Sequence, residues 1–450
     1  MSKRNTGVVF ALAGAVTLFF SFLVFGLRAH ASGLEMGEAQ SQEDHEIPEG
    51  KEGYSILGFQ AFWKDGIHLQ GPREKIKVRI GGSAKLDAGR LDGDDQIGRA
   101  FTDFIGQDAI LRSLRLNLLT TFYDTVEWKL EFDFANPAQI KENWFGLTSE
   151  IPYLGFLRAG YMKEPFSLEI LTSSTDLVFM EASLPVWTFA PGSNLGVRAQ
   201  NSAWEGRVNW AAGGFWNVQP TDRLGDASDR IDQSNGFDLT FRLYGLPWYE
   251  GEGGKLLHLG VGYNHRFVSN GELRYKTRPE TYLTDNALVD TKEFSVDRID
   301  LFNLEAAAVF GPLSYQGEVF YSLPAGGAGG THHFWGGYIL GSIFLTGEHR
   351  PYKQSEGVFS RIEPKHDFRP LRGGWGAWEL TARFSYVDCN SKEIRGGEEG
   401  NLTLGLNGYL SRHLQVMLNW IRARVKDRDT HPRVETGEAD IYQARFQIAF

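Results

Sequence analysis

The feature that most constrains this chain is a strict alternation of polar and apolar side chains. In residues 126–134 the even positions are apolar or aromatic, whereas the odd positions carry Glu127, Lys129, Glu131 and Asp133. A period of two places successive side chains on opposite faces of a β-strand. Four charged groups on one face cannot lie in a dry core without a large desolvation cost. One face of this strand therefore meets water, and the other meets an apolar medium.

The same pattern returns along the whole chain. Runs 75–87 and 378–386 alternate in this way, and run 442–450 ends the chain with a strand of aromatic character. About sixteen such runs lie between residues 76 and 450, whereas 273–283 alternates poorly and is assigned to a long loop. A soluble β-sandwich also alternates. Strand length, a polar face suited to a wet lumen and the aromatic last strand predict instead an all-β fold, a transmembrane antiparallel β-barrel of about 16 strands.

The composition and the N-terminus agree with an exported barrel. Hydrophobic residues make up 42% of the chain, too few for a bundle of membrane helices, and 53 Gly with 13% aromatic residues suit strands and tight turns. Lys3 and Arg4 precede an apolar run at 8–27 that ends in a small-x-small cleavage site at 29–31. We expect a signal peptide at 1–31, with a retained anchor helix as the alternative. A periplasmic N-terminal linker with short strands at 32–74 and an outer-membrane β-barrel at 75–450 would follow.

Charge and motif content exclude several classes of protein. A net charge of −10 argues against a nucleic-acid partner. Cys389 is the only cysteine, so neither an intrachain disulfide nor a cysteine zinc site can form. The sequence contains no zinc-protease, serine-hydrolase or phosphate-loop motif. We therefore expect no catalytic residues, no metal site and no enzyme.

Loop lengths predict the orientation of the barrel. Short turns are expected in the periplasm and long loops outside: the turns lie at 124–125, 311–312 and 411–412, and the loops at 89–108, 163–193, 217–234 and 268–297. The acidic segment 87–108 is expected to be solvated. The loop at 163–193 is rich in apolar residues and is predicted to fold into the lumen, because outside it would expose a large apolar surface. Segment 346–374 is long although it falls on the periplasmic side, so we expect it to fold into the pore mouth.

Several longer runs resemble the phosphate-selective porin O and P family. They include irregular loop sequence as well as strands, and they follow in order along the chain. The runs are 63–67, 78–82, 128–136, 157–168, 172–174, 179–181, 190–192, 194–197, 345–348 and 375–380.

The resemblance implies a bacterial outer-membrane porin, a homotrimer through which phosphate, polyphosphate or other small anions diffuse without a cofactor or an energy source. Its partners would be the permeant anions, outer-membrane lipid and lipopolysaccharide. Members of the family narrow the channel with an inward-folded third loop, here residues 162–193. This loop carries one clear base, Lys163, against Glu164, Glu169, Asp176 and Glu181. A general or cation-preferring porin without phosphate specificity is therefore the alternative.

Basic residues are the candidates for lining the pore and binding anions. Arg and Lys replace part of an anion's hydration shell with charge-assisted hydrogen bonds. Acidic residues are interleaved with them, so structural ion pairing within the wall is the competing interpretation. The candidates lie on polar strand faces, in the third loop and in segment 346–374: Lys77, Arg79, Arg115, Lys129, Arg158, Lys163, Arg242, Arg361, Lys365, Arg369, Arg372, Arg383 and Arg445.

Overall fold

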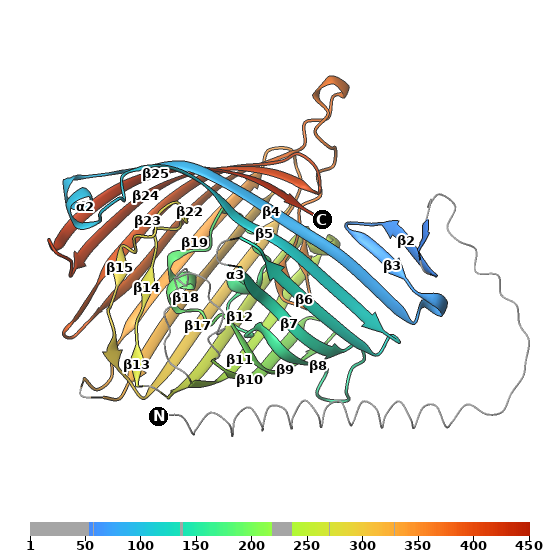
Figure 1. Ribbon diagram of the computed structural model, residues 1–450, viewed down its shortest axis with the longest axis horizontal. Coiled ribbons are helices and arrows are strands. Elements are labelled where there is room, and N and C mark those ends of the chain that lie inside the picture. The colour runs from blue at the N-terminus through green and yellow to red at the C-terminus, as the bar shows by residue number, and fades with distance from the viewer. Residues whose placement is uncertain (1–53, 57, 136–137, 218–235, 270, 328) are drawn as a thin grey trace, which may run out of the picture. The chain divides into compact units, whose positions relative to one another are not determined.

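Sixteen long antiparallel strands form one closed ring, as the alternation predicted. Each strand pairs with the next along the chain, and the last strand, β25, returns to the first, β4. In Figure 1 the strands run side by side at a slant, with blue β4 next to red β25. The strands are β4 (Ile76–Gly93), β5 (Gly106–Phe122), β6 (Val126–Asp133), β7 (Gln139–Leu147), β8 (Phe156–Lys163), β9 (Ser193–Ala203), β10 (Val208–Trp216), β11 (Gly236–Glu250), β12 (Lys255–Val268), β17 (Arg298–Phe310), β18 (Leu313–Ala325), β19 (Phe334–Phe344), β22 (Ala377–Ser391), β23 (Ile394–Tyr409), β24 (Leu414–Arg428) and β25 (Val434–Ala449).

The computed structural model describes residues 54–56, 58–135, 138–217, 236–269, 271–327 and 329–450. The predicted signal peptide at 1–31, most of the predicted linker and nearly all of the predicted loop at 217–234 lie outside the described residues. Among the described residues, no helix is long and apolar enough to cross a bilayer. The helices are α2 (Asp95–Ala100), α3 (Leu168–Leu171) and α4 (Leu184–Phe189), with 3-10 turns η1 (Pro72–Glu74), η2 (Gly251–Gly253) and η3 (Pro370–Arg372).

The two faces of the wall have the reverse polarity of a soluble protein. On β17 the outward side chain of Leu304 is 61% exposed, whereas its neighbour Glu305 is buried. Ile339 on β19 is likewise 63% exposed. Because the ring closes, its strands have no free edge and the backbone groups pair without water. The apolar outer face therefore fits the hydrocarbon of a bilayer, and the polar inner face encloses a lumen.

The seam between the first and last strands continues to the final residue. The Phe450 N–H donates to the Gly82 carbonyl, and the Gly82 N–H donates to the Phe450 carbonyl, both at 2.9 Å. Glycine is needed at position 82, because a Cβ there would lie 2.9 Å from the Arg115 carbonyl oxygen and 3.1 Å from the Phe450 ring. On the N-terminal side of the seam along β4, the sheet continues through three short strands, of which β3 pairs with residues 77–80 of β4. They are β1 (Tyr54–Ile56), β2 (Phe59–Trp63) and β3 (Ile67–Gln70).

The first long loop is shorter than the sequence predicted. Strand β4 runs to Gly93 and β5 begins at Gly106, so the loop between them is 94–105 and contains α2. Asp87 lies in the wall, where it is buried and pairs with Arg445 at 2.7 Å. The prediction of a solvated segment at 87–108 is wrong at its start, because cross-strand ion pairing retains Asp87 on the inner face of β4.

The third loop (residues 164–192) folds into the barrel, as predicted. Val186 and Phe189 of α4 are buried against Phe320 and Phe334 of the wall. The fifth loop (residues 271–297) joins the same core through Val289, and it contains two short pairs, β13 (Glu272–Leu273) with β16 (Phe294–Ser295) and β14 (Lys276–Thr277) with β15 (Val289–Asp290). Apolar residues that would be costly in water are therefore packed inside the ring.

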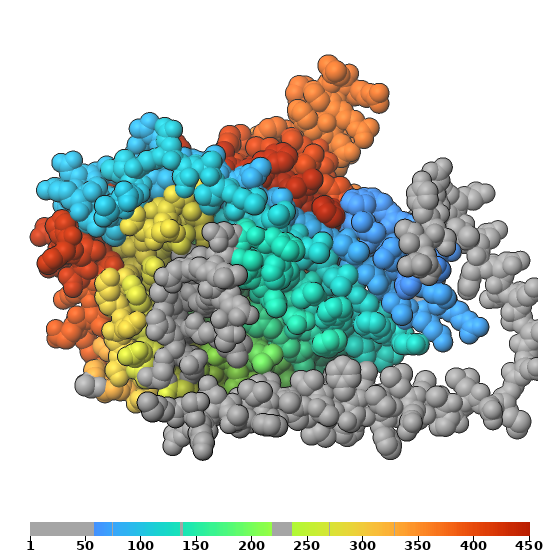
Figure 2. Space-filling view, viewed as in Figure 1, coloured from blue at the N-terminus to red at the C-terminus, as the bar shows by residue number. Residues whose placement is uncertain are grey.

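The long turn between β19 and β22 (residues 345–376) divides into two parts. Residues 350–362 pack inward, with Arg350 and Phe359 buried and a short pair formed by β20 (Tyr352–Lys353) and β21 (Val358–Phe359). Residues 363–374 are mostly exposed and form the orange projection at the top of Figures 1 and 2. The expected inward folding of 346–374 therefore holds for its first half only, since the second half carries few apolar residues to bury.

We expect removal of Ala449 and Phe450 to prevent assembly of the barrel. The truncation removes both hydrogen bonds to Gly82 and leaves backbone groups that hydrocarbon cannot satisfy. Exported protein should accumulate in the periplasm and lack the heat-modifiable gel migration of a folded barrel. The control variant Phe450→Tyr, which keeps the backbone and the ring, should assemble. Heat-modifiable barrels from the truncated chain would contradict this view of the seam.

Candidate functional site

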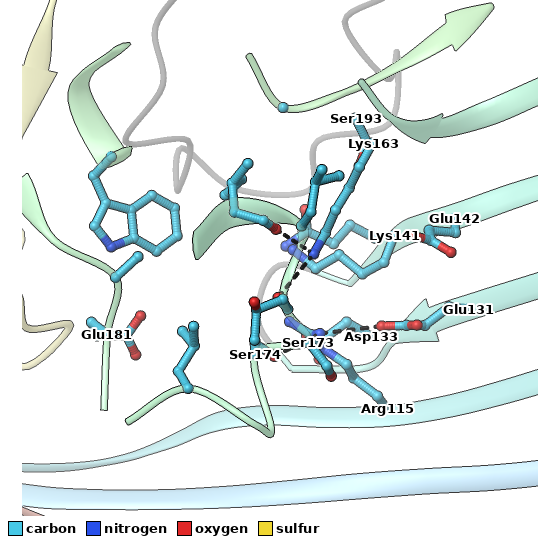
Figure 3. Close-up of a pocket in the computed structure, with 18 of the residues that line it drawn as sticks. Arg115, Glu131, Asp133, Lys141, Glu142, Lys163, Ser173, Ser174, Glu181 and Ser193 are labelled. Atoms are coloured by element: carbon cyan, nitrogen blue, oxygen red, sulfur yellow. Dashed lines mark hydrogen bonds and ion pairs between the residues drawn. The ribbon is translucent and has the colours of Figure 1, made fainter. Parts of the chain in front are cut away.

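A cavity of about 2000 Å³ occupies the lumen beside the third loop. Its boundaries are the inner faces of β4 to β9, the third and fifth loops, and residues 353–361 of the long turn. Among the described residues, fifteen basic and eleven acidic side chains line it. Figure 3 shows how charged side chains of the wall and the backbone of the third loop meet around this space.

Wall side chains hold the backbone of the third loop. The two carboxylate oxygens of Glu318 accept hydrogen bonds from the N–H groups of Leu168 and Glu169, at 3.2 and 2.8 Å. Asn407 donates to the Val178 carbonyl at 2.8 Å. These contacts satisfy backbone groups that are buried away from water. The loop is therefore a fixed part of the lumen rather than a free flap.

Glu181 is the main ionic anchor of the third loop. Its carboxylate pairs with Arg112 at 2.8 Å and with Arg445 at 2.6 Å. Burial raises the pKa of this carboxyl, but the two guanidinium groups outweigh that effect and hold the pKa at about 2. Glu181 therefore stays ionised at neutral pH and neutralises cations of the wall.

The other acidic residues of the third loop are engaged as well. Glu169 pairs with Arg383 at 3.4 Å, and Asp176 lies 3.7 Å from Arg361. Glu164 is fully buried and accepts hydrogen bonds from amide side chains of the wall. The acidic composition of the loop therefore does not give the lumen a free negative charge.

On the part of the wall that faces the third loop, cations and carboxylates form a connected network. Arg115 lies between Asp133, at 2.9 Å, and Glu131, at 3.2 Å, and it also donates to the Ser174 hydroxyl at 3.1 Å. Lys163 reaches the loop backbone, where its ammonium donates to the Ile170 carbonyl at 2.6 Å (Figure 3). These groups connect the wall to the loop and hold the width of the passage.

Three cations that line the cavity have no ion pair among the described residues. Arg158 and Arg198 face each other directly across β8 and β9. The Arg158 guanidinium lies 4.3 Å from the Trp144 ring, and Arg198 donates to an amide oxygen. Lys141 lines the same cavity without a carboxylate partner. Like charges opposite one another destabilise a sheet, so this part of the lumen favours an anion between or beside them.

Two lumen cations reach their positions through β-bulges. Lys141 is the extra residue where the register between β6 and β7 shifts after Glu131, and Arg112 is the extra residue where the register between β4 and β5 shifts after Lys85. A bulge re-aims the side chain of its extra residue. Strict alternation assigns both residues to the outer face, so the sequence pattern does not predict them in the lumen. Three further cations of the cavity lining come from the fifth loop: Arg274, Lys276 and Arg278. Their spacing of two residues was the one sequence signal that could have placed them on a common face.

The thirteen candidate residues fall into two groups. Six line the cavity: Arg79, Arg115, Lys129, Arg158, Lys163 and Arg361. The structure places the other seven elsewhere. Arg242, Arg383 and Arg445 are buried in ion pairs with Glu305, Glu280 and Asp87, because the inserted segments exclude water from them. Lys77 pairs with Asp124 at a short turn, and Lys365, Arg369 and Arg372 lie on the exposed part of the long turn.

The fold and the cavity together define the class of protein. A closed barrel with an apolar exterior, a polar lumen and an inserted loop is an outer-membrane porin, a channel of the bacterial outer membrane. The sequence model of the phosphate-selective porin O and P family matches residues 78–450, so the chain belongs to that family.

Individual relatives and solved structures agree with this assignment. The chain is 22% identical to Porin O of Pseudomonas aeruginosa over 424 residues, which cover 86% of this chain and 91% of the relative. It is 28% identical over 366 residues to an uncharacterized protein of Caulobacter vibrioides, with 80% and 70% covered. In fold it is similar to the anion-selective porin of Comamonas acidovorans, at a TM-score of 0.50, 15% identity and coverage of 83% and 100%. It is also similar to the channel DcaP of Acinetobacter baumannii, at a TM-score of 0.51, 11% identity and coverage of 84% and 99%.

We expect Glu181→Gln to loosen the third loop at neutral pH. Breaking a buried ion pair by removing one partner costs about 3–5 kcal/mol. Here Arg112 would lose its carboxylate partner, and Arg445 would keep only Asp87. Single-channel current should become noisier and larger, and deletion of residues 170–185 should raise conductance severalfold. The exposed substitution Glu363→Gln is the matched control. A deletion that leaves conductance unchanged would show that the loop does not narrow the pore.

The same anchor predicts how the channel responds to pH. The pKa of Glu181 lies below the ordinary value for Glu, so its contribution to stability is complete above about pH 4.5 and is lost as the pH falls toward 2. Wild-type current noise should therefore be constant from pH 7 to about 4.5 and rise in more acidic solution. In Glu181→Gln the noise should already be high at pH 7 and change little on acidification.

Proposed function

We propose that this porin passes small anions, phosphate among them, by passive diffusion. The observation that carries the proposal is the charge of the cavity, where basic side chains exceed acidic ones by four among the described residues. Lys141, Arg158 and Arg198 contribute donors that no carboxylate of the described residues occupies. Several weak sites in sequence let an anion enter and leave again. The family description and the anion selectivity named for the Comamonas acidovorans porin support the same function.

The engaged state of the acidic residues argues against a cation-preferring pore. Glu164, Glu169 and Glu181 of the third loop are each at least 95% buried and hydrogen-bonded or ion-paired. Arginines of the wall compensate the charges of Glu169 and Glu181, and Glu164 lies outside the cavity lining. Arg158 and Arg198, in contrast, line the cavity. The net field inside the lumen is therefore positive, which raises the local concentration of anions.

We expect the double variant Arg158→Gln and Arg198→Gln to shift the reversal potential in a potassium chloride gradient toward cations. The shift should be large at low salt and fade at about 1 M, where the screening length is only about 3 Å. Lys365→Gln with Arg372→Gln is the matched control, because it removes the same charge from the exposed part of the long turn. A wild-type pore that prefers cations, or equal shifts in both variants, would refute the proposal.

We also propose that the porin is a homotrimer. Strands β6 and β8 have only eight residues each, whereas a strand needs about 9–11 to cross a bilayer. A second copy against this short side of the wall would shield it from lipid. The outward rings of Trp128 and Phe145 stack there at 6.0 Å and supply an apolar contact. A trimeric form is named for OmpT of Vibrio cholerae, which has a similar fold.

Shortening both rings, as Trp128→Ala with Phe145→Ala, should convert trimers to folded monomers. The reason is that interface stability depends on buried apolar contact. The control, Leu304→Ala with Ile339→Ala, alters outward residues of the longer strands β17 and β19 and should leave the trimer intact. Unheated gel migration and native mass measurements distinguish these states. A wild-type protein that is monomeric in its native membrane extract would exclude the trimer.

A further inference from the structure

An aromatic site lies on the cavity wall where the third and fifth loops meet. Trp187 is the one large apolar residue of α4 that is not fully buried, and it lines the cavity. Its ring centroid lies 5.8 Å from that of Tyr282 in the fifth loop, in an edge-to-face arrangement. Both rings therefore border the cavity through which a solute would pass.

Two guanidinium groups flank these rings. The Arg112 guanidinium carbon lies 3.5 Å from the centroid of the Tyr282 ring, and that of Arg278 lies 4.9 Å from it. Both arginines line the cavity. Arg112 pairs with Glu181 at 2.8 Å, and Arg278 pairs with Asp285 at 2.9 Å. A guanidinium carries five N–H donors. Arg112 binds Glu181 through Nε and Nη2, so its Nη1 group can donate to a ligand.

We infer that Trp187, Tyr282, Arg112 and Arg278 form a binding site for anions that carry an aromatic ring, such as aromatic carboxylates. The ligand's ring would stack on the indole of Trp187, while its carboxylate accepts hydrogen bonds from a guanidinium. A small inorganic anion uses the cations alone and gains nothing from the rings. The inference rests on the proposed anion conduction and adds a class of permeant solute to it.

The chemistry of the site selects against other occupants. Aromatic rings attract cations through their faces, but Arg112 and Arg278 already occupy the surroundings of Tyr282 and repel a cationic solute. An aliphatic anion would gain apolar contact but not ring stacking, which adds about 0.5–1.5 kcal/mol between aromatic partners and corresponds to roughly twofold to tenfold in affinity. The property to measure is therefore how well the pore distinguishes an aromatic carboxylate from an aliphatic ring carboxylate of equal charge and similar size.

The experiment compares the block of potassium chloride current by benzoate and by cyclohexanecarboxylate, which have the same charge and nearly the same bulk. Wild-type pores should be blocked roughly twofold to tenfold more strongly by benzoate. Trp187→Leu should bring this ratio close to one, and Trp187→Phe, which keeps a ring, should restore most of it. The ratio is an internal measure, so a general change in pore width does not alter it. Heat-modifiable gel migration shows whether each variant has assembled.

The outcomes separate this inference from the proposed function. A wild-type pore that is anion-selective but blocked equally by both acids would overturn the aromatic site alone. A benzoate preference that survives in Trp187→Leu would also overturn it, because the ring would then not be the cause. A cation-selective wild-type pore would instead refute the proposed function, on which the site depends.

Discussion

The need to pair every backbone hydrogen-bonding group inside hydrocarbon is the constraint on which this structure depends. Lipid offers neither donors nor acceptors, so a strand can cross only if both of its edges are bonded. The chain meets this condition by returning β25 to β4 and by extending the seam to Phe450. Closure then decides which face of each strand meets lipid. The apolar side chains point outward, and the charged ones are left to share a lumen.

That lumen creates a second constraint, because charges brought together out of bulk water need partners. The acidic residues of the third loop supply many of them: Glu181 to Arg112 and Arg445, and Glu169 to Arg383. Inserting the loop thus neutralises cations of the wall and also buries the loop's own apolar residues. Arg158 and Arg198, which have no ion pair within the described part of the chain, line the cavity. The proposed anion conduction therefore depends on cations that the packing of the barrel does not use.

Much of the fold was predictable from local pattern, and the candidate site only in part. Alternation identifies the strands because the wall has a polar, hydrated inner face and an apolar outer face throughout. The apolar content of the third loop similarly requires it to fold inward. Arg383 and Arg445 occupy polar strand positions just as Arg158 does, yet they are buried in ion pairs. No local signal separates the two cases, since the difference depends on which segment of the chain covers each residue.

The sequence by itself determined the class of structure: an all-β barrel with an apolar exterior, a polar lumen and a loop inside it. It did so because these properties follow from side-chain period and hydrophobicity, which are local. Only the tertiary structure decided which cations line the pore. Lys141 and Arg112 enter it through single-residue bulges, and Lys365 stays outside because only half of the long turn packs inward. Both the register shifts and the covering of one segment by another depend on contacts between residues far apart in the chain. Local sequence pattern therefore does not determine them.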